Sequence, residues 1–177
     1  MFRQIYAVPR MVVRNLITHH KRGDIQTRSI LISIFTDLNQ RLITQESHRE
    51  LLRTYGFVDW LELAFIDVTP GDFAQYISVR GDAAGHQLFS HEQAGLIRNF
   101  VDKYKNEDMD RLLIHCDAGQ SRSGAIAAWA YYYLNRHGLV TFTPDKFWAS
   151  NKDISPNPFV ARMMCEASGM EYLEADF

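Results

Sequence analysis

The chain has 177 residues, of which 46% are hydrophobic, and a formal net charge of −2. This length suits one domain with a sizeable core, so we expect residues 1–177 to form a single domain. The small net charge argues against a nucleic-acid partner or binding to an acidic membrane surface. No apolar run is long enough to cross a bilayer, and the first fifteen residues lack the features of a signal peptide.

The two cysteines, Cys116 and Cys165, are too few for a disulfide framework. Small secreted domains depend on several disulfides, whereas cytoplasmic proteins keep their thiols reduced. We therefore expect a cytoplasmic protein with both thiols free. Cys165 follows two methionines in a predicted helix, and we interpret it as a core residue.

The first half of the chain alternates apolar runs with turn signals. β-Branched and apolar runs predict buried strands, and a helical pattern that stops at Gly56 predicts a helix. A further apolar run ends near Asp67, before a Pro-Gly turn cluster. In chain order, we expect strands at 4–9 and 29–35 with a basic loop between them, a helix at 44–56, a strand at 60–67 and an irregular segment at 70–90.

The second half of the chain carries clearer helix signals. Ser90 is followed three residues later by Gln93, which is a capping-box pattern. Pro144 and Pro158 occupy expected first helical positions, each behind a capping residue. The predicted elements are helices at 90–106, 121–138, 143–150 and 157–169 and a strand at 111–116. Strands that alternate with helices predict an α/β fold with a mainly parallel central sheet.

The most informative stretch is HCDAGQSRSG, residues 115–124, where a predicted strand meets a predicted helix. Binding sites of α/β sheets form at such junctions. A helix N-terminus presents unpaired N–H groups and the positive end of the helix dipole. A loop of small residues lets further N–H groups converge, and the result is a concavity suited to a tetrahedral oxyanion.

The residue types in this loop suggest a role for each. Cys116 ionises more readily at a helix N-terminus beside a cation, so we expect a thiolate nucleophile. Arg122 can bind two phosphate oxygens through its planar guanidinium. His115 can orient the loop or tune the thiolate, and Ser123 can donate to the sulfur as it leaves. The Asp117 carboxylate would repel an anion, so its side chain should point away. The residues expected to bind phosphate are Asp117, Ala118, Gly119, Gln120, Ser121 and Arg122.

The segment resembles the H-C-x5-R-[ST] phosphate loop of the cysteine-dependent protein tyrosine phosphatases, and AGQSRS is closest to the dual-specificity group. The ISI strand, the loop-bearing strand and the PNPFV helix are similar to a bacterial and phage-type group of predicted tyrosine phosphatases. The resemblance implies a three-layer α/β fold, a phosphocysteine intermediate on Cys116, and no cofactor or metal. The expected substrate is a phosphorylated protein, phosphotyrosine first, or a small phosphomonoester, and phosphate, sulfate or vanadate would occupy the loop.

The family also uses an upstream aspartate as general acid. The sequence has no W-P-D motif, and the candidates are Asp67, Asp72 and Asp82. Asp67 is favoured because it ends a predicted strand, as the family's acid does. Its separation from Cys116 is longer than is usual in compact dual-specificity enzymes, so the other two stay open.

Two alternatives to hydrolysis remain at this stage. One is a phosphate-binding module that lacks an effective acid. The other is sulfur or arsenate chemistry on a similar loop, for which Cys165 would be the available second thiol. The intact pair of Cys116 and Arg122 favours a phosphatase.

Overall fold

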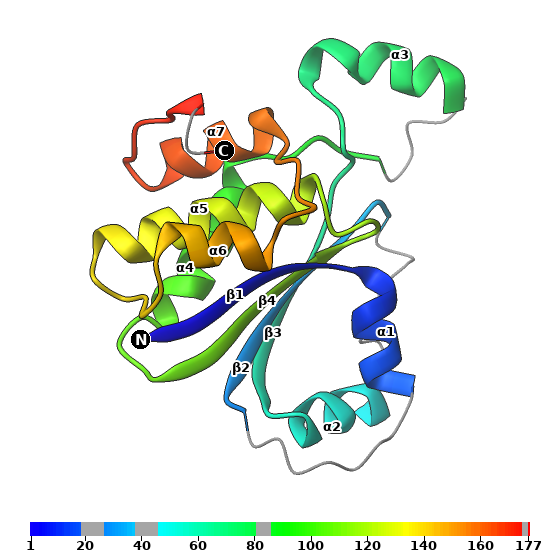
Figure 1. Cartoon of the computed structure of the whole chain (residues 1–177). Coiled ribbons are helices and arrows are strands. Elements are labelled where there is room, and N and C mark those ends of the chain that lie inside the picture. The colour runs from blue at the N-terminus through cyan, green and yellow to red at the C-terminus, as the bar shows by residue number, and fades with distance from the viewer. Residues whose placement is uncertain (19–26, 38–45, 81–85, 175–176) are drawn as a thin grey trace.

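The computed structural model describes residues 1–18, 27–37, 46–80, 86–174 and 177 (Figure 1). The strands of this part of the chain are β1 Phe2–Pro9, β2 Ser29–Phe35, β3 Phe57–Ala64 and β4 Met109–Cys116. Its helices are α1 Arg10–Thr18, α2 Glu46–Thr54, α3 Pro70–Arg80, α4 His91–Lys103, α5 Arg122–Arg136, α6 Pro144–Ser150 and α7 Pro158–Ala167. No helix among these residues is both long and apolar enough to cross a membrane.

The strands form one parallel sheet in the order β1-β4-β2-β3. Every residue of β2 is buried, which explains why its sequence is apolar almost throughout rather than alternating. Figure 1 shows α1 and α2 on one face and α4, α5 and α6 on the other, with α7 packed against α4 and α5. The expected three-layer α/β architecture is therefore confirmed.

Apolar side chains fill both interfaces between sheet and helices. Ile30, Ile32 and Ile34 of β2 face the larger core beneath α4 and α5. Leu31 faces the smaller core with Val13 of α1, in keeping with the alternation of side chains along a strand. The sheet is thus the shared inner wall of two cores, and its carboxyl edge is held in a fixed position.

The structure corrects the prediction at two helices. Residues 10–18, to which the sequence analysis had assigned no element, form α1. The basic stretch at 19–24, expected to be a loop, lies outside the described residues. Residues 70–80 form α3 rather than an irregular segment. Helix α3 projects beyond the carboxyl edge of the sheet in Figure 1, and its Val79 is 79% exposed, so it lacks the apolar stripe that reveals a packed helix.

The order of the strands creates a switch point at the carboxyl edge of the sheet. Strands β1 and β4 are neighbours, but the helices that follow them, α1 and α5, lie on opposite faces (Figure 1). The segments that follow β1 and β4 therefore diverge as they leave the sheet. Such switch points are where α/β sheets bind ligands. The segment at residues 116–122 occupies this position.

His115, the penultimate residue of β4, is completely buried. Its ring meets the Phe35 ring edge-on, with 5.5 Å between the centroids. Burial lowers the pKa of His115 from 6.5 to about 4. The imidazole is therefore neutral at pH 7, and any influence on Cys116 comes from its dipole or a hydrogen bond rather than a full positive charge.

Protonation of His115 should destabilise the fold at mildly acidic pH. The unfolded chain takes up this proton below about pH 6.5, whereas the folded chain resists it until about pH 4. From pH 7.5 to 5.0, His115 should therefore remove about 2 kcal/mol from the free energy of unfolding. Urea unfolding of wild type and His115→Gln at both pH values measures this loss. The variant should lose less stability, while His137→Gln, at an exposed histidine, should keep the wild-type dependence.

Candidate active site

The loop between β4 and α5 has its backbone oriented by its neighbours. Three of its carbonyl oxygens accept hydrogen bonds from outside the loop: that of Asp117 from the Arg10 amide, at 3.3 Å, and those of Gln120 and Ser121 from the amides of Ser155 and Asn157, at 3.3 and 3.2 Å. The C=O and the following N–H of a trans peptide point in opposite directions. The amides that follow these carbonyls therefore point away from the neighbours, as expected of an anion-binding loop. They belong to Ala118, Ser121 and Arg122.

Gly119 lets this loop lie against the end of β1. Its φ is +76°, a left-handed conformation that other residues adopt at a cost. A Cβ there would also lie 2.3 Å from the backbone nitrogen of Pro9 and 2.4 Å from the carbonyl carbon of Val8. The glycine is thus required both by the turn and by the close approach of β1.

Cys116 and Ser123 meet at the base of the loop. Their side chains are buried, and the Cys116 Sγ lies 3.1 Å from the Ser123 Oγ. Either atom can be the donor in this contact, and a serine that donates to sulfur stabilises a thiolate. Ser123 belongs to the first turn of α5, so the positive end of that helix dipole also acts on the sulfur.

Arg122 is a buried cation, with 4% of its surface exposed. Its Nη1 donates to the carbonyl oxygen of Phe65 at 2.8 Å and to the Thr36 Oγ1 at 3.3 Å, and its Nη2 donates to the Asp117 Oδ2 at 2.7 Å. The Nε is buried and has no hydrogen-bond partner among the described residues. The guanidinium is therefore fixed on one side and has a buried donor to offer on the other.

The Asp117 side chain is not where the sequence predicted it. We expected it to point away from the site, but it binds Arg122 and also forms an ion pair with Arg10, at 3.2 Å between Oδ1 and Nη1. Its Oδ2 accepts a further hydrogen bond from Thr36, at 2.9 Å. The physical reason is that a buried guanidinium needs an anionic partner, and Asp117 is the carboxylate that hydrogen-bonds to it, at 2.7 Å.

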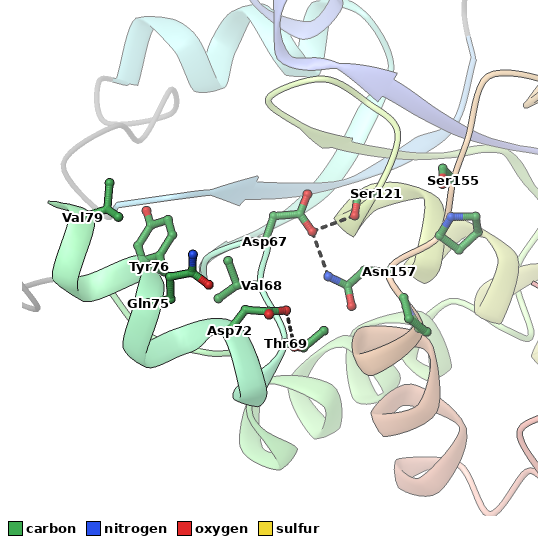
Figure 2. A pocket seen from close by; sticks show the side chains of 12 residues that line it. Asp67, Val68, Thr69, Asp72, Gln75, Tyr76, Val79, Ser121, Ser155 and Asn157 are labelled. Atoms are coloured by element: carbon green, nitrogen blue, oxygen red, sulfur yellow. Dashed lines mark hydrogen bonds between the residues drawn. The ribbon is translucent and has the colours of Figure 1, made fainter.

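Asp67 is brought to the loop, three residues beyond the end of β3. Its Oδ1 accepts hydrogen bonds from the Ser121 Oγ at 2.7 Å and the Asn157 Nδ2 at 2.9 Å (Figure 2). Its Oδ2 lies 3.9 Å from the Nε of Arg122. Asp72, by contrast, lies on α3 and accepts a hydrogen bond from Thr69, the residue just before that helix. Asp82 lies outside the described residues. Of the candidates that the structure describes, Asp67 is the one that contacts the loop.

Asn157 is a site residue that sequence reasoning read only as a helix cap. Its Oδ1 accepts hydrogen bonds from the amides of Phe159 and Val160, at 3.0 and 3.2 Å, at the start of α7. Because the cap uses the amide oxygen, the amide nitrogen must face Asp67. The Asn-Pro pair in the sequence predicts the helix cap, but nothing in the sequence predicts that the Asn157 side chain contacts Asp67.

A cavity of about 680 Å³ lies beside the loop (Figure 2). Asp67 and Ser121 form its inner wall, the carboxyl-terminal segment 155–158 forms a second wall, and α3 closes it with Gln75, Tyr76 and Val79. None of the described residues that line it is a lysine or arginine. The cavity therefore offers an apolar and acidic surface next to the loop between β4 and α5.

The remaining expectations concern metals and thiols. The described residues contain no group of three or more His, Cys, Asp or Glu side chains placed to hold a metal ion. Neither cysteine forms a disulfide, and Cys165 is completely buried in α7, where it packs in the main core. Its assignment as a packing residue fits this position.

Comparison with known proteins supports the fold. No protein-family model matches the chain, and neither does any curated protein. Among solved structures, the chain is similar to PTPMT1, a dual-specificity-like phosphatase crystallised in complex with PI(5)P. The TM-score is 0.50 at 16% sequence identity, over 94% of this chain and 90% of that one. At such low identity, this likeness shows that the two proteins share a fold and nothing beyond it.

Replacement of Gly119 tests the geometry of the loop. Gly119→Ala and Gly138→Ala both place a Cβ on a left-handed residue, which costs about 1–2 kcal/mol. Only at Gly119 does that Cβ meet other backbone atoms, since nothing lies within 4 Å at Gly138. We expect Gly119→Ala to lose about 1–3 kcal/mol more stability in urea unfolding, and to lose phosphate binding in calorimetry. Equal effects of the two substitutions would contradict this geometry.

Proposed function

We propose that the protein is a phosphomonoester hydrolase of the cysteine-dependent tyrosine phosphatase type, with Cys116 as nucleophile. The single observation that carries this proposal is the buried guanidinium of Arg122, whose Nε makes no hydrogen bond among the described residues, at a loop that begins with a cysteine. A buried donor without a partner is costly, and a bound anion removes that cost. The likeness of HCDAGQSRSG to the family's phosphate loop and the phosphatase fold of PTPMT1 support the same conclusion.

In the proposed reaction, the phosphate monoester binds to the inward N–H groups of the loop. Arg122 adds a side-on contact through Nε and the remaining Nη2 hydrogen. The Cys116 thiolate attacks phosphorus, a sulfur–phosphorus bond forms, and the bond from phosphorus to the ester oxygen breaks. Asp67 gives its proton to the departing oxygen, which leaves as an alcohol or phenol.

The second half of the reaction releases phosphate. Asp67, now a carboxylate, takes a proton from water as the water oxygen attacks phosphorus. The sulfur–phosphorus bond breaks and its electron pair returns to Cys116. Ser123, 3.1 Å from the sulfur, donates a hydrogen bond to the thiolate that leaves. Each group therefore ends in the state in which it began.

The cavity beside the loop favours a phosphorylated protein as the substrate. Phosphoinositide headgroups are recognised by clusters of lysine and arginine, and the described lining of this cavity includes Asp67 and Asp72 but neither basic residue. Tyr76 and Val79 of α3 provide apolar surface for residues that flank a phosphotyrosine. Phosphotyrosine in a protein therefore fits this wall better than PI(5)P. We also propose that the protein is similar to the bacterial and phage-type tyrosine phosphatases.

Substitution of the acid candidates tests the mechanism. Cys116→Ser should abolish hydrolysis of p-nitrophenyl phosphate and of a phosphotyrosine peptide. Asp67→Asn should lower kcat on the peptide by about 10²–10⁴-fold. It should lower kcat less on p-nitrophenyl phosphate, because nitrophenolate leaves without a proton. Steady-state kinetics at pH 6–7 measures both effects.

Asp72→Asn is the matched control, since it removes the same charge from the same cavity. It should leave both rates within about twofold of wild type, as surface substitutions usually do. If Asp72→Asn shows the large loss instead, the acid has been misassigned. If wild type binds vanadate but hydrolyses neither substrate, the loop is a binding module and the enzyme proposal is wrong.

The choice of substrate has its own test. We expect kcat/KM for a phosphotyrosine peptide to exceed that for PI(5)P in detergent micelles by at least about tenfold, a difference of 1.4 kcal/mol in transition-state binding. Malachite-green detection of released phosphate measures both reactions in one assay. A preference for PI(5)P would contradict the reading of the cavity while leaving the mechanism intact.

A further inference from the structure

Asp117 presents a problem for any anion-binding role of its loop. It directly follows Cys116, and a carboxylate at this place repels a phosphate dianion. Partial burial raises the pKa of Asp117, but hydrogen bonds from Arg122 and Thr36 and the charges of Arg122 and Arg10 lower it more, so the net pKa lies below its usual value. The side chain is therefore a carboxylate at neutral pH, and the site must compensate for its charge.

The structure places a second arginine where it can provide this compensation. Arg10 begins α1, directly after β1, and its Nη1 lies 3.2 Å from the Asp117 Oδ1. The other carboxylate oxygen binds the Nη2 of Arg122 at 2.7 Å. The Arg10 amide also donates to the Asp117 carbonyl at 3.3 Å, so backbone and side chain hold the same residue. Asp117 therefore lies between two guanidinium groups.

Arg10 also limits how Asp117 can bind Arg122. With one Asp117 carboxylate oxygen in an ion pair with Arg10, the other binds Nη2. The Nε of Arg122 makes no hydrogen bond among the described residues, and the Asp67 Oδ2 faces it at 3.9 Å. Arginine and carboxylate prefer a two-point contact when nothing prevents it. Without Arg10, both Asp117 oxygens become available to Arg122, which would occupy the side of the guanidinium that a phosphate needs.

We propose that Arg10 is a positioning residue that, by pairing with Asp117, neutralises the loop carboxylate and keeps the Nε side of Arg122 available to the substrate phosphate. This inference rests on the proposed function, because it assumes that the loop binds a phosphate. Arg10 acts through Asp117 and does not itself touch the reacting atoms. The signature of such an indirect role is that its effect depends on the charge of Asp117.

A double-mutant cycle tests this dependence with wild type, Arg10→Gln, Asp117→Asn and the double variant. The readouts are the inhibition constant of inorganic phosphate and the separate KM and kcat for p-nitrophenyl phosphate. Arg10→Gln alone should raise the inhibition constant and KM by about five- to tenfold and change kcat by less than about twofold. In the Asp117→Asn background, the same substitution should change either constant by less than about twofold.

Arg3→Gln is the matched control. Arg3, on β1, likewise pairs with an aspartate, Asp110 of β4, at 3.6 Å, but it lies near the other end of these two strands from Arg10 and Asp117. This variant should leave phosphate inhibition and KM unchanged. Urea unfolding of all variants shows whether the Arg10 substitution acts through the fold instead.

Two results would overturn the inference. If Arg10→Gln weakens phosphate inhibition equally with and without the Asp117 charge, Arg10 attracts the phosphate directly. If it weakens phosphate inhibition in neither background, its ion pair is a surface contact without consequence. Calorimetric titration of phosphate into Cys116→Ser separates this inference from the proposed function. If the loop of that variant binds no phosphate and wild type has no activity, the proposed function fails. If the variant binds phosphate and wild type is active, the double-mutant cycle tests the role of Arg10 alone.

Discussion

The buried charge of Arg122 is the constraint on which the carboxyl edge of the sheet depends. A guanidinium that is 4% exposed has lost most of its hydration, and breaking one of its contacts leaves an uncompensated buried charge. Its partners come from the ends of three strands: Thr36 after β2, the carbonyl of Phe65 after β3, and Asp117 after β4. One side chain thus ties together segments that are separated by up to 86 residues.

The strand order makes this convergence possible. Because β4 lies between β1 and β2 and its helix leaves on the opposite face from α1, the chain after β4 is free to turn into the space between the diverging ends (Figure 1). Gly119 fits against β1 there, Arg10 reaches Asp117 from the start of α1, and Thr36 reaches it from the end of β2. The charged groups therefore meet through parallel strands that end at the same edge, not through proximity in the sequence.

Local signals made the central part of the site predictable from sequence. The strand–loop–helix order around Cys116 and Arg122 is carried by neighbouring residues, so it could be read directly, as could the caps at Ser90, Thr143 and Asn157. The contacts of Arg10 and Asn157 with the site were not predictable, because they join residues more than 80 positions apart. Helix α3 was missed for a different reason: it has no long apolar stripe and no sheet beneath it. Helix α1 has apolar residues at helical spacing, at positions 12, 13, 16 and 17, but it is only nine residues long.

The long separation between Asp67 and Cys116, which had counted against Asp67, has a structural explanation. The intervening chain includes α3, which forms the outer wall of the cavity next to Asp67 (Figure 2). The Asp67 carboxylate does not depend on α3 for its position, because Ser121 of the loop and Asn157 of the α7 cap both donate hydrogen bonds to its Oδ1. Ser121 belongs to the loop that would bind phosphate, and the Asn157 amide donates to the Ser121 carbonyl. The proposed acid is thus held by the loop between β4 and α5 itself, which fixes it without a W-P-D motif and leaves α3 free to shape the cavity.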